Sequence, residues 1–96
     1  MIRTIADKST RDLFDGINSK ASRRLPVELH PKARRLLDFI NAAGNINDLR
    51  VPPGNHLEAL KGNWRGFYSV RINDQWRIAF RWVDGNAEEV QVVDYH

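Results

Sequence analysis

The spacing of apolar residues changes at the middle of the chain, and this change constrains the fold most strongly. Before the proline- and glycine-rich stretch Val51–Asn55, apolar residues recur at helical spacing, and after it they alternate with polar ones. A recurrence at i, i+3, i+4 and i+7 is typical of an amphipathic helix, whereas alternation is typical of a strand with one buried face. The sequence therefore predicts a helical half followed by a sheet half.

The clearest helix is expected after Pro31, a residue that suits the first turn of a helix. Gly44 ends the helix. The apolar stripe that defines it consists of Ala33, Leu36, Leu37, Ile40 and Ala43. The charged residues on its other face are Lys32, Arg34, Arg35 and Asp38. A solvated surface is the favoured interpretation of that face, and a contact with an RNA backbone is the alternative.

Two shorter elements are expected before this helix. Residues Ile2–Ala6 can form a short strand. Ser9–Asp12 resembles a capping box with Asp in place of Glu, and it predicts a helix that continues through Leu13, Phe14 and Ile17. Gly16 and Asn18 would end or fray that helix.

The sheet half begins with a hairpin. Its loop length can be inferred from which side chains would share one face of the sheet. A two-residue loop at Asn73–Asp74 would place Val70 opposite Arg77. A three-residue loop, Asn73–Gln75, keeps one face apolar. The pairs that it predicts are Tyr68 with Phe80, Val70 with Ile78, and Ile72 with Trp76.

A third strand is expected after a second turn at Asp84–Asn86. Its apolar residues Val90 and Val92 then lie opposite Phe80 and Ile78, and Val93 lies opposite Arg77. The residues predicted on the other face are Arg71, Arg77, Arg81, Glu89, Val93 and Tyr95. With helices free to cover the apolar face, the expected fold is α+β, as one domain over residues 1–96.

Composition narrows the class of function. The chain has no cysteine, which excludes disulfides, thiolate nucleophiles and cysteine zinc sites. His30, His56 and His96 lack the spacing of metal ligands, so no metal is expected. The segment Met1–Asp7 reads as neither a signal peptide nor a membrane span, which favours the cytoplasm. The net charge of +3, concentrated in the first half, suits a partner that carries phosphates or carboxylates.

The end of the chain offers the residue types for RNA cleavage. With the neighbouring 2′-hydroxyl as nucleophile, that reaction requires a general base, a general acid and cations beside the phosphate. Asp94, Tyr95 and His96 can provide the proton transfers, and Arg77 and Arg71 can bind phosphate. On the residues alone, a frayed terminus and arginines paired with acids such as Glu89 are the favoured alternative.

The stretch Leu57–Gly66 is expected to be a loop, with Glu58, Lys61 and Arg65 among its charged residues. Lys61 is the preferred candidate for a phosphate contact, although a solvated loop lysine is the slightly favoured interpretation of this residue on its own. The tryptophans Trp64, Trp76 and Trp82 could stack on bases. For Trp76 and Trp82, which share a face with Ile78, core packing is the favoured interpretation.

Three separated motifs resemble the HigB branch of the RelE toxin superfamily. They are PPGNHLEALKG at Pro52–Gly62, YSVRINDQWRIAF at Tyr68–Phe80, and VDYH at Val93–His96. The resemblance implies a small twisted antiparallel sheet packed against two N-terminal helices, and cleavage of messenger RNA in the ribosomal A site without a cofactor. It also implies a HigA-type antitoxin with a helix-turn-helix domain, which represses the operon together with the toxin. The site residues that it implies are Asp94, Tyr95, His96, Arg77 and Lys61.

One position departs from the family pattern. Some members have a catalytic-site histidine where this chain has Glu58, and the nearest histidine here is His56. Three alternatives follow: His56 substitutes for it, Glu58 is the base, or His96 carries more of the proton transfer. A protein that acts mainly as a co-repressor, with little catalysis, is the alternative function. A direct DNA-binding repressor is a weaker third, because no helix-turn-helix pattern is present.

Overall fold

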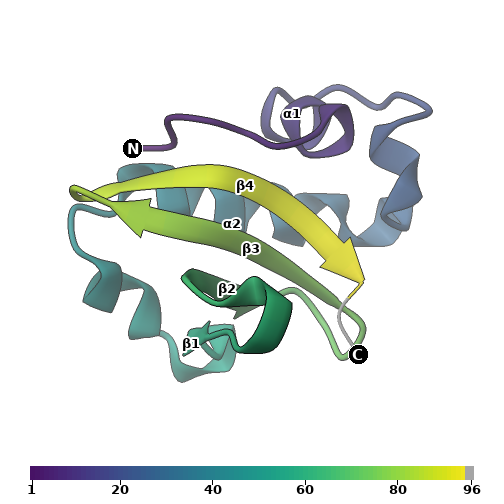
Figure 1. Cartoon of the computed structure of the whole chain (residues 1–96). Helices are drawn as coiled ribbons and strands as arrows, with labels where there is room; N and C mark the ends of the chain where they lie inside the picture. Colours follow the sequence, from purple (N-terminus) through teal and green to yellow (C-terminus); the bar gives the residue numbers. More distant parts are fainter. Residues whose placement is uncertain (95–96) are drawn as a thin grey trace.

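Two α-helices and a four-stranded antiparallel sheet build the fold in the computed structural model, which describes residues 1–94 (Figure 1). The sheet order is β1-β2-β3-β4. The helices and strands are α1 (Lys8–Phe14), α2 (His30–Ala42), β1 (Glu58–Ala59), β2 (Phe67–Arg71), β3 (Trp76–Val83) and β4 (Asn86–Asp94). Short 3₁₀ turns connect them, at Ser22–Arg24, Val27–Leu29, Ile46–Arg50, Pro53–Asn55 and Gly62–Trp64. The predicted α+β class is confirmed.

The hairpin β2–β3 has the register expected from its apolar face. Tyr68 pairs with Phe80 and Val70 with Ile78. The Ile72 amide donates to the Trp76 carbonyl at 2.9 Å, so the three-residue loop is confirmed. Within the loop, the side-chain oxygen of Asn73 accepts from the amides of Gln75 and Trp76. This contact closes the turn without a glycine.

The hairpin β3–β4 differs from expectation in two details. Its turn has two residues, Asp84 and Gly85, both with positive φ, and Asn86 already belongs to the strand. The register shifts between Ala79 and Arg81, so the expected Phe80–Val90 ladder pair is replaced by an irregularity. An extra residue in one strand explains that shift. The expected pairs of Ile78 with Val92 and of Arg77 with Val93 are confirmed.

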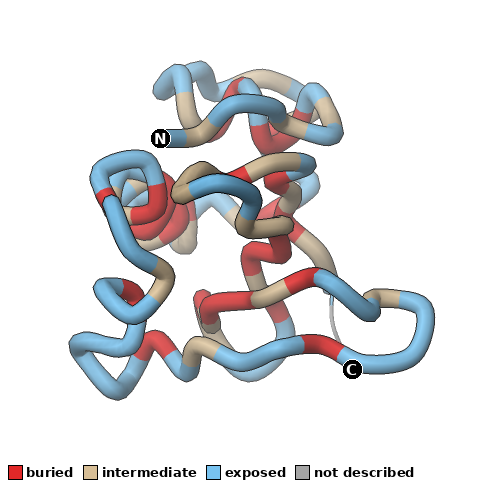
Figure 2. The backbone as a smooth tube through the Cα atoms, turned by 60° about the vertical axis from the view of Figure 1, so that its left-hand side comes forward, coloured by how far each residue is buried: buried red, intermediate tan, exposed pale blue. Residues whose placement is uncertain are grey.

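Helix α2 lies against the apolar face of the sheet, behind it in Figure 1. The predicted stripe is buried, from Ala33 to Ala43, and Pro31 lies in the first turn as expected. The helix ends at Ala42, one residue before the end of the predicted stripe, because Ala43 is already extended. In Figure 2 the buried backbone is concentrated in α2 and the central strands, whereas the connecting loops are mostly exposed. The main core therefore lies between α2 and the sheet.

The N-terminal segment runs parallel to β4 and covers its outer edge. Ile2 bridges to Ala87 and Ile5 to Val90, as two isolated bridges rather than the expected strand. Between them, Glu89 has a φ of +52°, which interrupts a regular ladder. The Thr4 hydroxyl accepts from the Glu89 amide at 2.7 Å. A sheet edge that would otherwise expose unpaired amides is thereby protected.

Helix α1 begins earlier than its sequence suggested. Its N-cap is Asp7, which accepts from the Thr10 amide at 2.8 Å, so the capping box expected at Ser9–Asp12 is wrong. Asp12 instead accepts from the Ser19 hydroxyl at 2.6 Å and from Lys8 at 2.9 Å. These hydrogen bonds hold the pKa of Asp12 below its ordinary value of 3.8.

The expected end of α1 is confirmed at Gly16. Gly16 has a φ of +76°, its amide donates to Leu13, and the next amide donates to Asp12. This is a Schellman arrangement, which glycine favours because it lacks a Cβ. Ile17, expected in the helix, lies beyond it and is exposed.

The other face of the sheet has a small apolar cluster of its own. Leu60, Phe67 and Ala79 are buried there, with Trp64 and Val93 packed against them. Arg81 lies over the ring of Phe67, 4.5 Å from its centroid. The arginine-rich face expected from the alternation is therefore partly apolar. No helix among residues 1–94 has the length and the apolar character required to span a membrane.

Candidate active site

Arg77, on β3, lies at the centre of a group of polar contacts. Its Nε donates to the Ser69 hydroxyl at 2.7 Å, and its Nη2 donates to the His56 carbonyl at 2.6 Å. The same Nη2 lies 3.2 Å from a carboxylate oxygen of Glu58. Only 12% of the Arg77 side chain is exposed. A guanidinium with this burial and these partners has a fixed orientation.

Strand pairing brings these residues together. Glu58 pairs with Ser69 between β1 and β2, and Arg71 pairs with Arg77 between β2 and β3. Three adjacent strands thus place Glu58, Ser69 and Arg77 within reach of one another. The expectation of a loop over Leu57–Gly66 is wrong here, because Glu58–Ala59 forms the edge strand β1. Two residues are too few to show any periodicity.

The structure describes two of the three residues that could replace the missing histidine, Glu58 and His56. Glu58 directs its carboxylate to the Arg77 guanidinium, and it is therefore placed as an ion-pair partner. His56 has a φ of +46°, so the chain is not extended from His56 to Glu58. It is the carbonyl of His56, not its ring, that contacts Arg77.

Of the three terminal candidates, the structure describes Asp94, the last residue of β4. Asp94 pairs with Trp76, one position further along the strand than the pair of Arg77 with Val93. Its carboxylate accepts from the Gln75 side chain at 3.0 Å. Alternation along β4 places Asp94 on the face of Trp76 rather than that of Arg77. Tyr95 and His96 lie outside the described residues.

The other basic candidates do not join the Arg77 group. Arg71 forms an ion pair with Asp74 in the β2–β3 loop. Arg81 pairs with Glu89 at 2.8 Å, as the alternative interpretation expected. Lys61 is exposed at the start of the 3₁₀ turn Gly62–Trp64. Lys61 can therefore reach a polyanion, but the structure gives it no fixed position.

The three tryptophans pack against the protein. Trp76 is buried in the core, and Trp82 packs edge-on against Phe80. Trp64 meets Phe67 edge-on, with ring centroids 5.0 Å apart. The favoured interpretation of Trp76 and Trp82 as core residues is confirmed, and base stacking by Trp64 stays an untested prediction.

Residues 1–94 contain no candidate metal centre. Within residues 1–94, no three histidine, aspartate or glutamate side chains gather closely enough to hold an ion. The chemistry available at the Arg77 group is electrostatic: a positioned cation beside a carboxylate and a hydroxyl. A planar guanidinium is well matched to phosphate oxygens.

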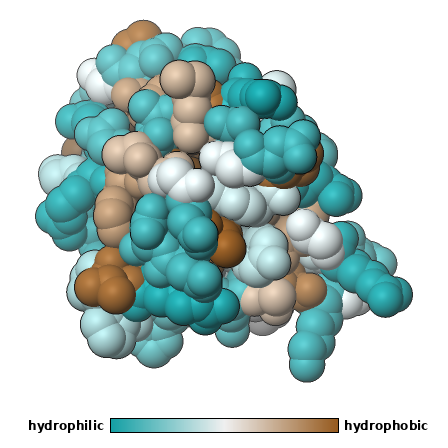
Figure 3. Space-filling model, turned by 90° about the vertical axis from the view of Figure 1, so that its left-hand side faces the viewer, coloured by the Kyte–Doolittle hydropathy of each residue, from teal (hydrophilic) through white to brown (hydrophobic). Residues whose placement is uncertain are grey.

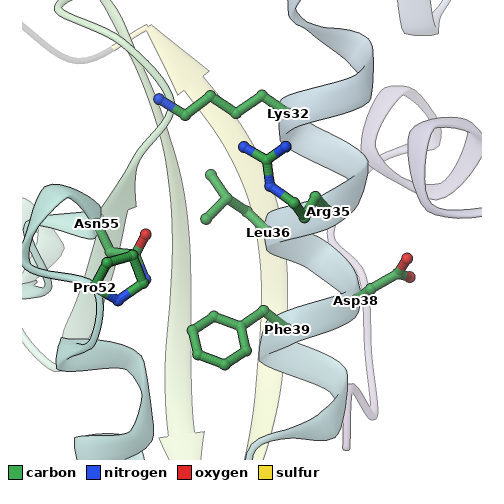
Figure 4. Close-up of a pocket in the computed structure, with 7 residues that line it drawn as sticks. All are labelled: Lys32, Arg35, Leu36, Asp38, Phe39, Pro52 and Asn55. Carbon is green, nitrogen blue, oxygen red and sulfur yellow. The ribbon is translucent and has the colours of Figure 1, made fainter.

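A groove of about 470 Å³ lies elsewhere, between α2 and the Pro52–Asn55 segment. In Figure 4, Leu36 and Phe39 point from the helix toward that segment, whereas Asp38 points away from it. The groove contains Lys32 and Arg35 of the charged helix face, but none of the candidate catalytic residues. The view in Figure 3 is mostly hydrophilic, with hydrophobic residues in separate small patches.

Similarity to known proteins covers nearly the whole chain. Residues 4–96 match the family model of the HigB-like toxins, described as RelE-like toxins of type II toxin–antitoxin systems. The chain is 43% identical to Toxin HigB-1 of Vibrio cholerae over 70 residues, 73% of this chain and 74% of that protein. It is 29% identical to Endoribonuclease HigB of Proteus vulgaris over 97 aligned positions that cover both proteins completely.

Solved structures share the fold. A mutant of YafQ from E. coli superposes with a TM-score of 0.66 at 15% identity, covering 98% of this chain and 93% of that one. A chain of the YoeB-YefM complex from Staphylococcus aureus gives a TM-score of 0.62 at 23% identity, covering 100% and 98%. These likenesses agree with the helices and the sheet described above. The match of the family model over residues 4–96 shows that this chain belongs to the HigB family of RelE-like toxins of type II toxin–antitoxin systems.

Proposed function

We propose that the protein is an endoribonuclease that cleaves messenger RNA through the 2′-hydroxyl next to the scissile phosphate. The observation that carries the proposal is the Arg77 guanidinium, mostly buried and held by Ser69, Glu58 and the His56 carbonyl. A cation held in this way stabilises charge on phosphate oxygens in the transition state, because it needs little reorganisation. The relative from Proteus vulgaris, Endoribonuclease HigB, supports the same activity.

The proton transfers are assigned to the end of the chain. Asp94, Tyr95 and His96 provide a carboxylate, a phenol and an imidazole directly after the β4 residue that pairs with Arg77. An imidazole exchanges protons near neutral pH, which suits a general acid or base. The 2′-hydroxyl supplies the nucleophile, so the proposed reaction requires no metal. Lys61 and Arg71 are proposed to bind phosphates that flank the cleaved one.

The proposed partners are a HigA-type antitoxin, and the ribosome with its messenger RNA, in the cytoplasm. The solved complexes of YoeB with YefM pair a toxin of this fold with an antitoxin. A positive net charge of +3 favours association with both ribosomal RNA and an acidic protein segment. Operator DNA is reached only through the antitoxin.

The test is transcript cleavage by purified toxin, with and without ribosomes, followed by mapping of the new 5′ ends. Arg77→Ala is expected to reduce cleavage by about 100-fold or more, as loss of a charge-stabilising group does. Arg11→Ala is the matched control, because it removes the same charge from an exposed position on α1. Deletion of His96 should also reduce cleavage while antitoxin binding persists.

The outcomes separate the two functions. Equal cleavage by the Arg77→Ala and Arg11→Ala variants would remove Arg77 from the site. No cleavage by the wild type under any condition, together with normal operator repression by its antitoxin complex, would favour the co-repressor alternative.

A further inference from the structure

We propose that Ser69 is a positioning residue that sets the orientation of the Arg77 guanidinium for the reaction. Ser69 lies in the middle of β2 and is fully buried. Its hydroxyl oxygen accepts from Arg77 Nε at 2.7 Å. This inference rests on the proposed endoribonuclease function, in which Arg77 contacts the phosphate.

The position of Ser69 in the sheet indicates that its hydroxyl has a function. Its register partners are Glu58 on β1 and Ala79 on β3, and Phe67, on the same face of β2, is buried in the small apolar cluster. A buried hydroxyl among apolar groups is costly unless it is hydrogen-bonded. Alanine would fill the same space without that cost. The hydroxyl is therefore best explained by its bond to Arg77.

The Arg77 guanidinium is held at two of its nitrogen atoms. Ser69 holds Nε, while the His56 carbonyl and Glu58 hold Nη2. Because the guanidinium is planar, contacts at both nitrogens set its rotation as well as its place. Loss of the Ser69 hydroxyl would remove the hydrogen bond that holds Nε.

Ser69 and Glu58 are not equivalent restraints. Glu58 is an anion with 53% of its side chain exposed, so water screens its attraction and a bound phosphate competes with it for Arg77. The Ser69 hydroxyl is neutral and shielded from water, so it does not oppose an incoming phosphate. We infer that the bond to Ser69 persists when the substrate binds, and that it keeps the guanidinium oriented during cleavage.

The Ser69→Ala variant keeps the cation but loosens its orientation. Attraction to RNA should therefore persist, and KM should change less than about twofold. The rate constant kcat should fall by about 10-fold to 100-fold, because small displacements of a catalytic group have effects of this size. Ser69→Thr restores the hydroxyl and should recover most of the activity where the variant folds.

A double-mutant cycle tests whether Ser69 acts through Arg77. In the Arg77→Ala background, Ser69→Ala should cause no further loss, because the group that it orients is gone. The same fold-loss in both backgrounds, or a change in KM alone, would overturn the proposal. If the wild type cleaves no RNA, it is the proposed function that fails, because the cycle then has no starting activity.

A second readout does not depend on cleavage. The Nε–H of Arg77 can be followed by ¹⁵N-resolved NMR, and its exchange with water should be slow while it is bonded to a buried oxygen. Ser69→Ala should accelerate that exchange more than about tenfold. The Nε–H of Arg81 is the internal control and should not change, because Arg81 forms its ion pair with the exposed carboxylate of Glu89, at 2.8 Å from Nε. Unchanged exchange at Arg77 would contradict the proposed restraint.

Discussion

The hydrogen bond from the Val92 amide to the Thr10 hydroxyl should be one of the strongest single contacts between α1 and the sheet. Its length is 2.9 Å, and Thr10 is fully buried. Thr10→Val keeps the shape of the side chain and its helix propensity, but replaces the acceptor with a methyl group. The Val92 amide then remains buried without a partner.

The size of the effect follows from two opposing contributions. A buried amide that loses its acceptor destabilises the fold by about 1–3 kcal/mol. Burial of the new methyl group returns about 0.8 kcal/mol. The net loss is therefore about 0.2–2.2 kcal/mol, with a middle value of about 1 kcal/mol. In a domain of this size each kcal/mol lowers Tm by roughly 4–8 °C, so the middle value corresponds to a fall in Tm of about 4–8 °C.

The chain supplies a matched control on the same strand. The Thr4 hydroxyl accepts from the Glu89 amide at 2.7 Å, but this contact is exposed. Water can replace the lost acceptor there, so Thr4→Val should change stability by less than about 0.5 kcal/mol. Urea unfolding at constant m-value measures both variants. Equal losses in the two variants would refute the argument from burial.

Two other predictions concern α1 and the glycine that precedes β2. Because Ser19 and then Lys8 lower the pKa of Asp12, its contribution to stability is present above the ordinary pKa and disappears as pH falls through the lowered one. Asp12→Asn should therefore flatten the acid limb of a plot of Tm against pH, and a limb as steep as that of the wild type would contradict this. Gly66 has a φ of +93°, and an added Cβ would lie 2.9 Å from Arg81, so Gly66→Ala should lower unfolding free energy by at least about 1 kcal/mol. Gly54→Ala, with nothing within 4 Å of its Cβ, should be neutral in the same denaturation assay.

The fold was largely predictable because its signals are periodic. The α2 stripe and the alternation in β2 and β3 each repeat over several residues. The requirement that one face of the sheet is apolar then predicted the loop length and the Ile78–Val92 pair. The predictions that were wrong concern features that depend on only one or two residues. The bulge at Glu89 and the two-residue strand β1 have no period to detect.

The candidate site was predictable in part for the same reason. Arg77 was identified from the face that it shares with Val93, and from a resemblance in sequence motifs. Its contact with Glu58 could not be predicted, because it depends on β1. Ser69 was visible as a serine on the face of Arg77, but its spacing alone did not distinguish a buried hydroxyl from a solvated one.

The N-terminal cover on β4 has a consequence for how the protein is made. Thr4 and Thr10 contact residues 85 and 82 positions later, so these two hydroxyls must wait for β4 to be synthesised. At about 5–20 residues per second, that wait lasts several seconds. During this time β4, and the terminal residues beyond it, have not been made. The contacts that join Thr4 and Thr10 to the sheet therefore form only after β4 has been synthesised.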